Sequence, residues 1–197
     1  MNITLIIIGI AVSVLLLLQF FSNRSQRNIE TYSFELVKSY GAFEVRNYES
    51  SLFTSVQLPS NEYKKVSSAG FSILANYIFG GNKENQKIAM TSPVAMTLED
   101  TMTVMFMLPK DLQKDNLPQP TNSKIKFIEE PAKKVAVITF GGWANDEKIN
   151  NYKQKLITAL EAEGINHNGK FYFLGYNPPY EIFNRRNEIM VELTQDV

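Results

Sequence analysis

Residues 51–81 read SLFTSVQLPSNEYKKVSSAGFSILANYIFGG, and this stretch decides the fold because the spacing of its apolar residues changes once. Ser51 to Leu58 is rich in β-branched and aromatic residues, which predicts a short strand. After Pro59, apolar residues recur at steps of three and four as far as Tyr77, which predicts an amphipathic helix. Gly80-Gly81 is typical of a helix C-terminus. A strand followed by one helix is therefore expected.

Short strands are predicted on both sides of this unit. Two of them, at 32–38 and 43–48, come before it around a turn at 39–41. Two more, at 88–90 and 102–108, come after it, and Pro93 interrupts the first of these patterns. The first half of the chain therefore predicts a small sheet with one helix.

The same order of elements recurs in the second half. Strands are predicted at 124–129, 135–140, 171–176 and 188–193, with a helix from the N-cap Asn145 to near Gly164. Sliding the chain by 85 positions places Pro93 on Pro178, Val104 on Ile189 and Leu108 on Leu193. The order predicts an internal duplication. Because neither half can bury its sheet alone, we expect an α+β fold whose two sheets pack together or close into a barrel, with both helices outside.

The N-terminus differs from the rest of the chain. Residues 3–21, ITLIIIGIAVSVLLLLQFF, reach roughly 28 Å as a helix, close to the ~30 Å of a bilayer's hydrocarbon core. No basic residue precedes Ile3, which favours an uncleaved anchor over a cleaved signal peptide. We expect a transmembrane anchor at 1–22, a linker at 23–31 and one domain at 32–197. Arg24 and Arg27 weakly place that domain in the cytoplasm.

The composition excludes several classes of function. Lys and Arg number 20, Asp and Glu number 20, and the net charge of zero argues against a nucleic-acid partner. The chain has no Cys, which excludes disulfides, thiolate nucleophiles and thiolate metal ligands. With a single histidine, the usual Ser–His catalytic pairs are absent too. Glu129 and Glu130 are neighbours on a strand and face opposite ways, so they do not form an acid/base pair. No catalytic residues and no metal ligands are therefore predicted.

Five blocks carry a family resemblance: FEVRNY (43–48), GFSILANYIFGGN (70–82), KIAMTSPV (87–94), TFGGWA (139–144) and GYNPPYEIFNRRNEI (175–189). In this order they resemble the SOUL haem-binding protein family over residues 32–193. The resemblance implies a distorted antiparallel β-barrel of two pseudo-symmetric halves with two outer helices. It also implies a shallow apolar cleft for haem or another tetrapyrrole. This cleft would be lined by Phe71, Ala75 and Ile78 from the first helix and by Tyr180 and Ile182 from the loop after the GYNPP block.

The chain departs from the family at the iron ligand. Some members carry a His after the Arg of the FEVRNY block, whereas this chain has Asn47. The one histidine, His167, is expected to be a solvated loop residue. Affinity would then depend on apolar burial, on propionate contacts with Arg185 or Lys64, and on a tyrosinate such as Tyr48 or Tyr180.

Other motifs have plainer structural explanations. The run Arg185-Arg186-Asn187-Glu188 resembles an anion site, but a hairpin turn with Glu188 paired to an Arg explains it as well. Gly80-Gly81-Asn82 follows a helix and is better explained as a cap than as a phosphate loop. The methionines at 90, 96, 102, 105 and 107 suit a core or a cleft lining better than a metal site.

The sequence as a whole predicts a membrane-anchored, non-enzymatic protein that binds a tetrapyrrole without a histidine ligand and acts as a carrier, buffer or sensor. The alternative is an anchored protein-interaction module of the same fold that no longer binds haem. A small-molecule hydrolase is a third hypothesis.

Overall fold

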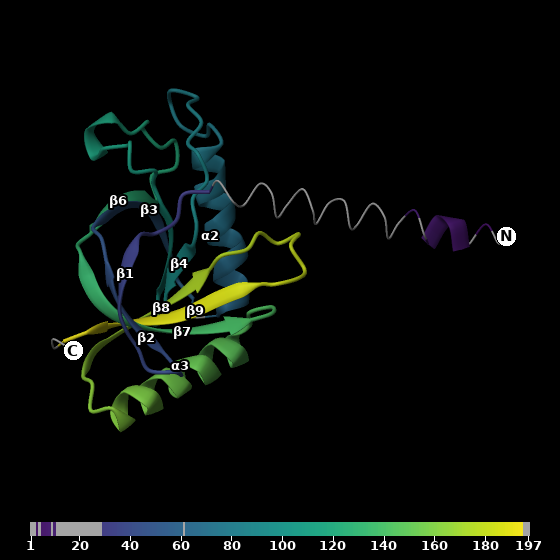
Figure 1. The fold of residues 1–197 in the computed structure, drawn as a ribbon. Helices are drawn as coiled ribbons and strands as arrows, with labels where there is room; N and C mark the ends of the chain where they lie inside the picture. The colour runs from purple at the N-terminus through teal and green to yellow at the C-terminus, as the bar shows by residue number, and fades with distance from the viewer. Residues whose placement is uncertain (1–2, 4, 9, 11–28, 61, 195–197) are drawn as a thin grey trace.

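Nine strands form one curled antiparallel sheet in a computed structural model that describes residues 3, 5–8, 10, 29–60 and 62–194 (Figure 1). The strands are β1 (Phe34–Ser39), β2 (Glu44–Tyr48), β3 (Ser51–Leu58), β4 (Val94–Thr97), β5 (Met102–Met107), β6 (Ile125–Glu130), β7 (Lys133–Gly141), β8 (His167–Gly175) and β9 (Arg186–Leu193). The helices are α2 (Tyr63–Ile78), α3 (Asp146–Ala162) and the short 3-10 helix η1 (Lys114–Asn116). The predicted α+β class is confirmed.

The strand order is nearly symmetrical about the middle of the sheet. It runs β1-β2-β7-β9-β8-β4-β5-β3-β6. Without β1, each side of the sheet contains three strands of one half and one strand of the other, because β2 pairs with β7 and β6 pairs with β3. The two halves therefore exchange β2 and β6, and neither side of the sheet is complete without a strand from the other half.

A four-residue ladder between β4 and β8 joins the halves. Met96 lies opposite Phe173 in this ladder, and Ala95 lies opposite Leu174. Away from this seam the register repeats: Val56 faces Val104 in the first half, and Ile138 faces Ile189 in the second. The offset of 85 that places Val104 on Ile189 in the sequence thus places them at matching positions in the sheet.

Both helices pack on the same face of the sheet. The larger buried cluster contains α2 residues such as Leu74, α3 residues such as Leu156, and sheet residues that include Val104 and Ile189. Figure 1 shows α2 and α3 on the outside of the curled sheet, with α3 along its lower edge. The expected position of the two helices is confirmed.

The inner face of the sheet is packed with aromatic residues. Tyr32 lies between the two ends of the curled sheet, with its ring 4.3 Å from that of Tyr48 on β2 and 5.3 Å from that of Phe53 on β3. Tyr48, Phe53 and Met105 belong to a second buried cluster that contains no residue of either helix. In the described part of the chain β1 and β6 are free edges, so the expected barrel is instead an open, curled sheet.

Two predictions about the first half need correction. Residues 88–90 are not a strand, because the Ile88 amide donates to the carbonyl of Ile78 at the end of α2 (2.8 Å), and the strand begins after Pro93. Pro93 and Pro178 are not equivalent either, since the first precedes β4 and the second follows β8.

The predicted helix ends are close to those observed. Asn145 is the N-cap of α3, where its side chain accepts from the Lys148 amide (2.8 Å). After α2, Gly80 has a φ of +108°, a conformation that favours glycine, and the Gly81 amide donates to Asn76 (2.8 Å). The glycine pair therefore ends the helix, as the sequence predicts.

The predicted single-pass anchor at residues 1–22 is wrong as judged by the structure. Within the described residues, no helix is both long enough and apolar enough to cross a bilayer. Residues 1, 2, 4, 9 and 11–28 lie outside the described part. The expected cytoplasmic orientation rested on this anchor and loses its basis with it.

Replacing Gly70 with Ala should destabilise the fold. A Cβ atom at this position would lie 2.4 Å from Cγ2 of Val104, so α2 would have to move away from β5. Overpacking costs about 1–3 kcal/mol, more than the gain of up to about 1 kcal/mol in helix propensity. Chemical denaturation should show a net loss of unfolding free energy.

Two further variants test the cause. Ser68→Ala on the exposed side of α2 should change stability by less than about 0.5 kcal/mol. In the Gly70→Ala background, Val104→Ala should cost less than it does alone, because it removes the Cγ2 methyl group that lies closest to the added Cβ. Strict additivity of the two substitutions would contradict the proposed contact.

Candidate ligand-binding surface

The two halves differ most clearly in the loop that follows β8. The connection between β8 and β9 spans residues 176–185, whereas the matching connection between β4 and β5 spans only 98–101. In Figure 1 the longer loop, drawn in yellow, projects away from the sheet. Insertions in one copy of a repeated unit are frequent places for a binding site. This loop contains the GYNPP block except its glycine, and it carries the predicted cleft residues Tyr180 and Ile182 and the predicted rim residue Arg185.

Arg185 holds the loop together. Its Nη1 donates to the carbonyls of Glu181 (2.6 Å) and Pro178 (2.9 Å), and its Nη2 donates to that of Asn177 (3.2 Å). Burial lowers the pKa of Arg185 from its ordinary value. Both terminal nitrogens are thus used inside the loop. The expected role of Arg185 as a rim cation for propionates is therefore less well supported than a role in fixing the backbone.

Asn177 and Glu181 fix the base of the loop. The Asn177 side chain donates to Oε2 of Glu181 (2.9 Å) and accepts from the Arg186 amide (2.6 Å). Glu181 is buried although it lies in a surface loop. The backbone at this end of the molecule is therefore held by polar contacts made within the loop itself.

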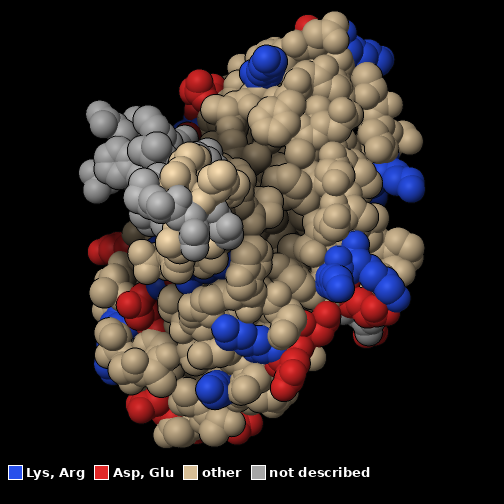
Figure 2. All heavy atoms as spheres, turned by 90° about the vertical axis from the view of Figure 1, so that its right-hand side faces the viewer, with Lys and Arg blue, Asp and Glu red and all other residues tan. Residues whose placement is uncertain are grey.

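Large apolar side chains project from this well-held backbone. Tyr180 is 65% exposed, Ile182 is 44% exposed and Phe183 is 59% exposed. We call these three residues the loop surface. Figure 2 looks onto the side toward which the loop projects in Figure 1, and uncharged residues cover most of its upper and central part. Exposed apolar residues that gather in one place often mark a binding site.

The three helix residues of the predicted cleft lie deeper. Ile78 is 2% exposed and Ala75 is 8% exposed, and both belong to the core beneath α2. Phe71 is half-buried, with its ring 5.2 Å from that of Phe106. The structure thus places the helix residues in or against the core and the loop residues at the surface. Their contact with a ligand stays a prediction.

A buried ionic network lies on the inner face of the sheet beside the loop. Glu188 on β9 is fully buried, and its carboxylate accepts two hydrogen bonds at 3.1 Å from the Arg46 guanidinium on β2. The same carboxylate accepts from Arg186 (2.6 Å) and from the Tyr176 hydroxyl (2.7 Å). The expected pairing of Glu188 with an Arg is confirmed, but the expected hairpin turn at Asn187 is wrong, because Arg186, Asn187 and Glu188 lie on β9.

The network sets the ionisation of its members. Burial alone would raise the pKa of Glu188, but hydrogen bonds from Arg46 and Tyr176 and the charges of two arginines hold it below its ordinary value. Burial raises the pKa of Tyr48, which is 2% exposed. Tyr48 therefore stays protonated at neutral pH and is a poor candidate for the tyrosinate considered above.

The two positions relevant to iron ligation are far less buried. Asn47 is an exposed residue of β2, opposite Glu35 and Lys134 in the sheet. His167 is the first residue of β8 and not a loop residue, and its Nδ1 accepts from the Gly169 amide (3.1 Å). Within the described ranges, no group of three or more acidic or histidine side chains is arranged to hold a metal ion.

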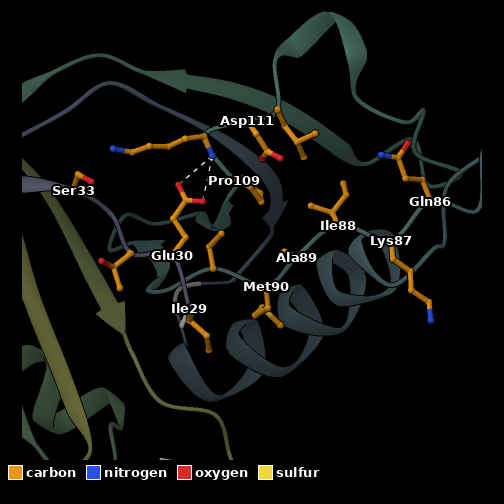
Figure 3. A pocket seen from close by; sticks show the side chains of 14 residues that line it. Ile29, Glu30, Ser33, Gln86, Lys87, Ile88, Ala89, Met90, Pro109 and Asp111 are labelled. Carbon is orange, nitrogen blue, oxygen red and sulfur yellow. Dashed lines mark hydrogen bonds between the residues drawn. The ribbon is translucent and has the colours of Figure 1, made fainter. Parts of the chain in front are cut away.

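The sequence did not predict a trough of about 870 Å³ (Figure 3). It lies among three segments, 29–33, 86–91 and 109–112. Figure 3 shows the Glu30 carboxylate accepting from the Lys110 amide at one side and Lys87 pointing away from the opening. None of the predicted cleft residues lines this trough. Of the five blocks that carry the family resemblance, KIAMTSPV is the one that contributes residues to its lining.

Comparison with known proteins identifies the family. The SOUL heme-binding protein model matches residues 29–192, and the chain belongs to this family. Mouse heme-binding protein 2 is 31% identical over 159 residues, which cover 76% of this chain and 77% of the relative. Heme-binding protein 1 of Xenopus laevis is 29% identical over 156 residues, with coverages of 75% and 82%. The resemblance predicted from the five blocks is confirmed.

Solved structures support the fold. The C-terminal domain of EcmrR superposes with a TM-score of 0.62 at 10% identity, covering 78% of this chain and 98% of that domain. At this level of identity the likeness concerns the fold alone.

Removing the charge of Glu188 should destabilise the protein strongly. Glu188→Gln removes the buried carboxylate that faces Arg46 and leaves the guanidinium only the partly exposed Glu44 as an anionic partner. Breaking a buried pair costs about 3 kcal/mol or more. Chemical denaturation at neutral pH measures the loss. Glu49→Gln is the matched control, because Glu49 pairs with Lys110 at the exposed surface, where solvent screens the pair and its loss should change stability little.

The stability difference between wild type and Glu188→Gln should also depend on pH. Because the folded-state pKa of Glu188 lies below 4.5, its stabilising contribution is present above that pH and is lost as pH falls through the folded value. The stability difference between wild type and Glu188→Gln should therefore narrow in acid. A difference that stays constant from neutral pH down to about pH 3 would contradict this assignment.

Proposed function

We propose that this protein binds haem or another tetrapyrrole reversibly, with the ligand lying against the loop surface of Tyr180, Ile182 and Phe183. The observation that carries the proposal is the apolar loop at 176–185, which one half of a nearly symmetrical fold has and the other lacks. Membership of the SOUL family and relatives named heme-binding proteins support it. A flat apolar ligand would cover side chains that are now largely exposed.

The proposed binding does not use a histidine ligand. Asn47 occupies the position of the family histidine, and His167 lies at the start of β8, outside the loop. Apolar contact with the porphyrin face would then supply most of the affinity. Metal-free protoporphyrin should accordingly bind about as tightly as haemin.

Reversible binding without a strong iron bond suits a carrier or a buffer for tetrapyrroles. A ligand held by surface contacts leaves faster than one held by axial coordination, and it is replaced easily by a similar ring system. A sensor is the third role in this class, and it would need a change of shape on binding.

A second candidate is a protein-interaction module that has lost haem binding. The exposed aromatic and aliphatic side chains of the loop surface favour it, since such residues are also frequent at protein interfaces. The two candidates differ in whether the purified protein binds a tetrapyrrole at all.

Titration of the purified full chain with haemin and with metal-free protoporphyrin tests the proposal. We expect saturable changes in the absorption of both ligands at micromolar concentrations, with dissociation constants within about threefold of each other, a difference below ~0.7 kcal/mol. Absence of binding for both ligands would refute the proposal and favour the interaction module. Binding of haemin alone would show that an iron ligand has been missed.

Variants locate the site. Ile182→Asp places a charge on the loop surface and should weaken binding by about tenfold or more, ~1.4 kcal/mol. Leu36→Asp is the matched control, because Leu36 is similarly exposed but lies on β1. His167→Ala should change neither the affinity nor the absorption spectrum. Equal losses in Ile182→Asp and Leu36→Asp would argue against the loop surface.

A further inference from the structure

The loop between β7 and α3 presents the chain's single tryptophan beside the β8–β9 loop. Trp143 is 53% exposed, although tryptophan is among the most costly side chains to leave in water. Trp143 lies outside the cleft that the family resemblance implies. Its exposure needs an explanation, because the backbone beside it is held in place by hydrogen bonds.

Polar contacts fix the backbone of this loop at the two residues before the tryptophan. The Asn187 side chain on β9 donates to the Gly142 carbonyl (2.8 Å), and the Lys148 ammonium on α3 donates to the Gly141 carbonyl (2.6 Å). Gly142 has a φ of +74°, which glycine adopts without strain. The loop therefore holds the exposed tryptophan in a defined place.

Arg185 links this tryptophan to the loop surface. The centre of its guanidinium lies 4.0 Å from the centroid of the Trp143 ring, a stacked cation–π contact. The same guanidinium donates to the carbonyls of Pro178 and Glu181. One side chain thus fixes the ring of Trp143 relative to the backbone that carries Tyr180 and Ile182.

We propose that Trp143 is a direct ligand contact, whose indole stacks on the tetrapyrrole, and that Arg185 is a positioning residue that holds the indole for this purpose. This inference rests on the proposed function and extends its site to the β7–α3 loop. With Arg185 against the ring and about half of the side chain still exposed, the indole offers open aromatic surface to a flat ligand. Aromatic stacking on such a surface adds affinity without requiring a metal.

Three variants test the contact. Trp143→Ala should weaken binding of metal-free protoporphyrin, followed by its own absorption, by about tenfold (~1.4 kcal/mol), and Trp143→Phe should recover most of that loss. Phe79→Ala is the matched control, because Phe79 is an aromatic residue of similar exposure at the C-cap of α2. It should bind like wild type.

A spectroscopic measurement shows whether the indole itself touches the ligand. Because the chain has one tryptophan, a ¹⁵N-labelled sample gives one indole N–H signal. Saturation with metal-free protoporphyrin should displace this signal strongly through the ring current of a stacked porphyrin. An unmoved indole signal in a protein that does bind protoporphyrin would overturn the inference while leaving the proposed function standing. Absence of binding in wild type would refute the proposed function itself.

Two variants separate positioning from charge at Arg185. Arg185→Lys keeps the charge but cannot donate to the loop carbonyls in the same forked geometry, and Arg185→Gln loses the charge as well. If Arg185 positions the indole, both variants should weaken binding similarly and should shift the indole signal of the unliganded protein. Full affinity in Arg185→Lys with loss only in Arg185→Gln would show that Arg185 binds the ligand's carboxylates instead.

Discussion

The ladder between β4 and β8 is the constraint on which the rest of the structure depends. It is the seam at which the two halves meet, and it places Met96 against Phe173 in the core. The exchange of β2 and β6 between the halves completes each side of the sheet around this seam. Both helices must then lie on one face, and the side chains of the other face must fill the space that the curled sheet encloses.

The side chains that pack the inner face limit where a ligand can bind. The inner face holds Tyr32 between Tyr48 and Phe53, and it holds the buried Arg46–Glu188 pair. Such a pair costs desolvation and stabilises the fold only when both partners are present. We accordingly propose that a large flat ligand binds at the rim of the sheet and not on this packed inner face. The loop at 176–185 lies at that rim and departs from the approximate symmetry of the halves.

The sequence predicted the features that depend on local chemistry. The strand–helix order, the Asn145 cap and the glycines that end α2 follow from neighbouring residues alone. The open edge of the sheet and the pairing of Arg46 with Glu188 depend on packing between distant segments, so spacing could not reveal them. The family resemblance pointed to Tyr180 and Ile182 of the proposed site, whereas Phe183 was recognised only from its exposure in the structure. The burial of Ala75 and Ile78 was not predicted, because one apolar helix face serves equally well in a core and in a cleft.

Mapping the amide signals of the protein saturated with metal-free protoporphyrin tests the central claim most directly. The account predicts that the largest changes fall at residues 142–144 and 178–185, with the strands of the sheet little affected. Changes concentrated instead at 86–91 and 109–112, around the trough of Figure 3, would contradict it. The ligand would then lie in the cavity between the first half and residues 29–33, and the loop would have another role.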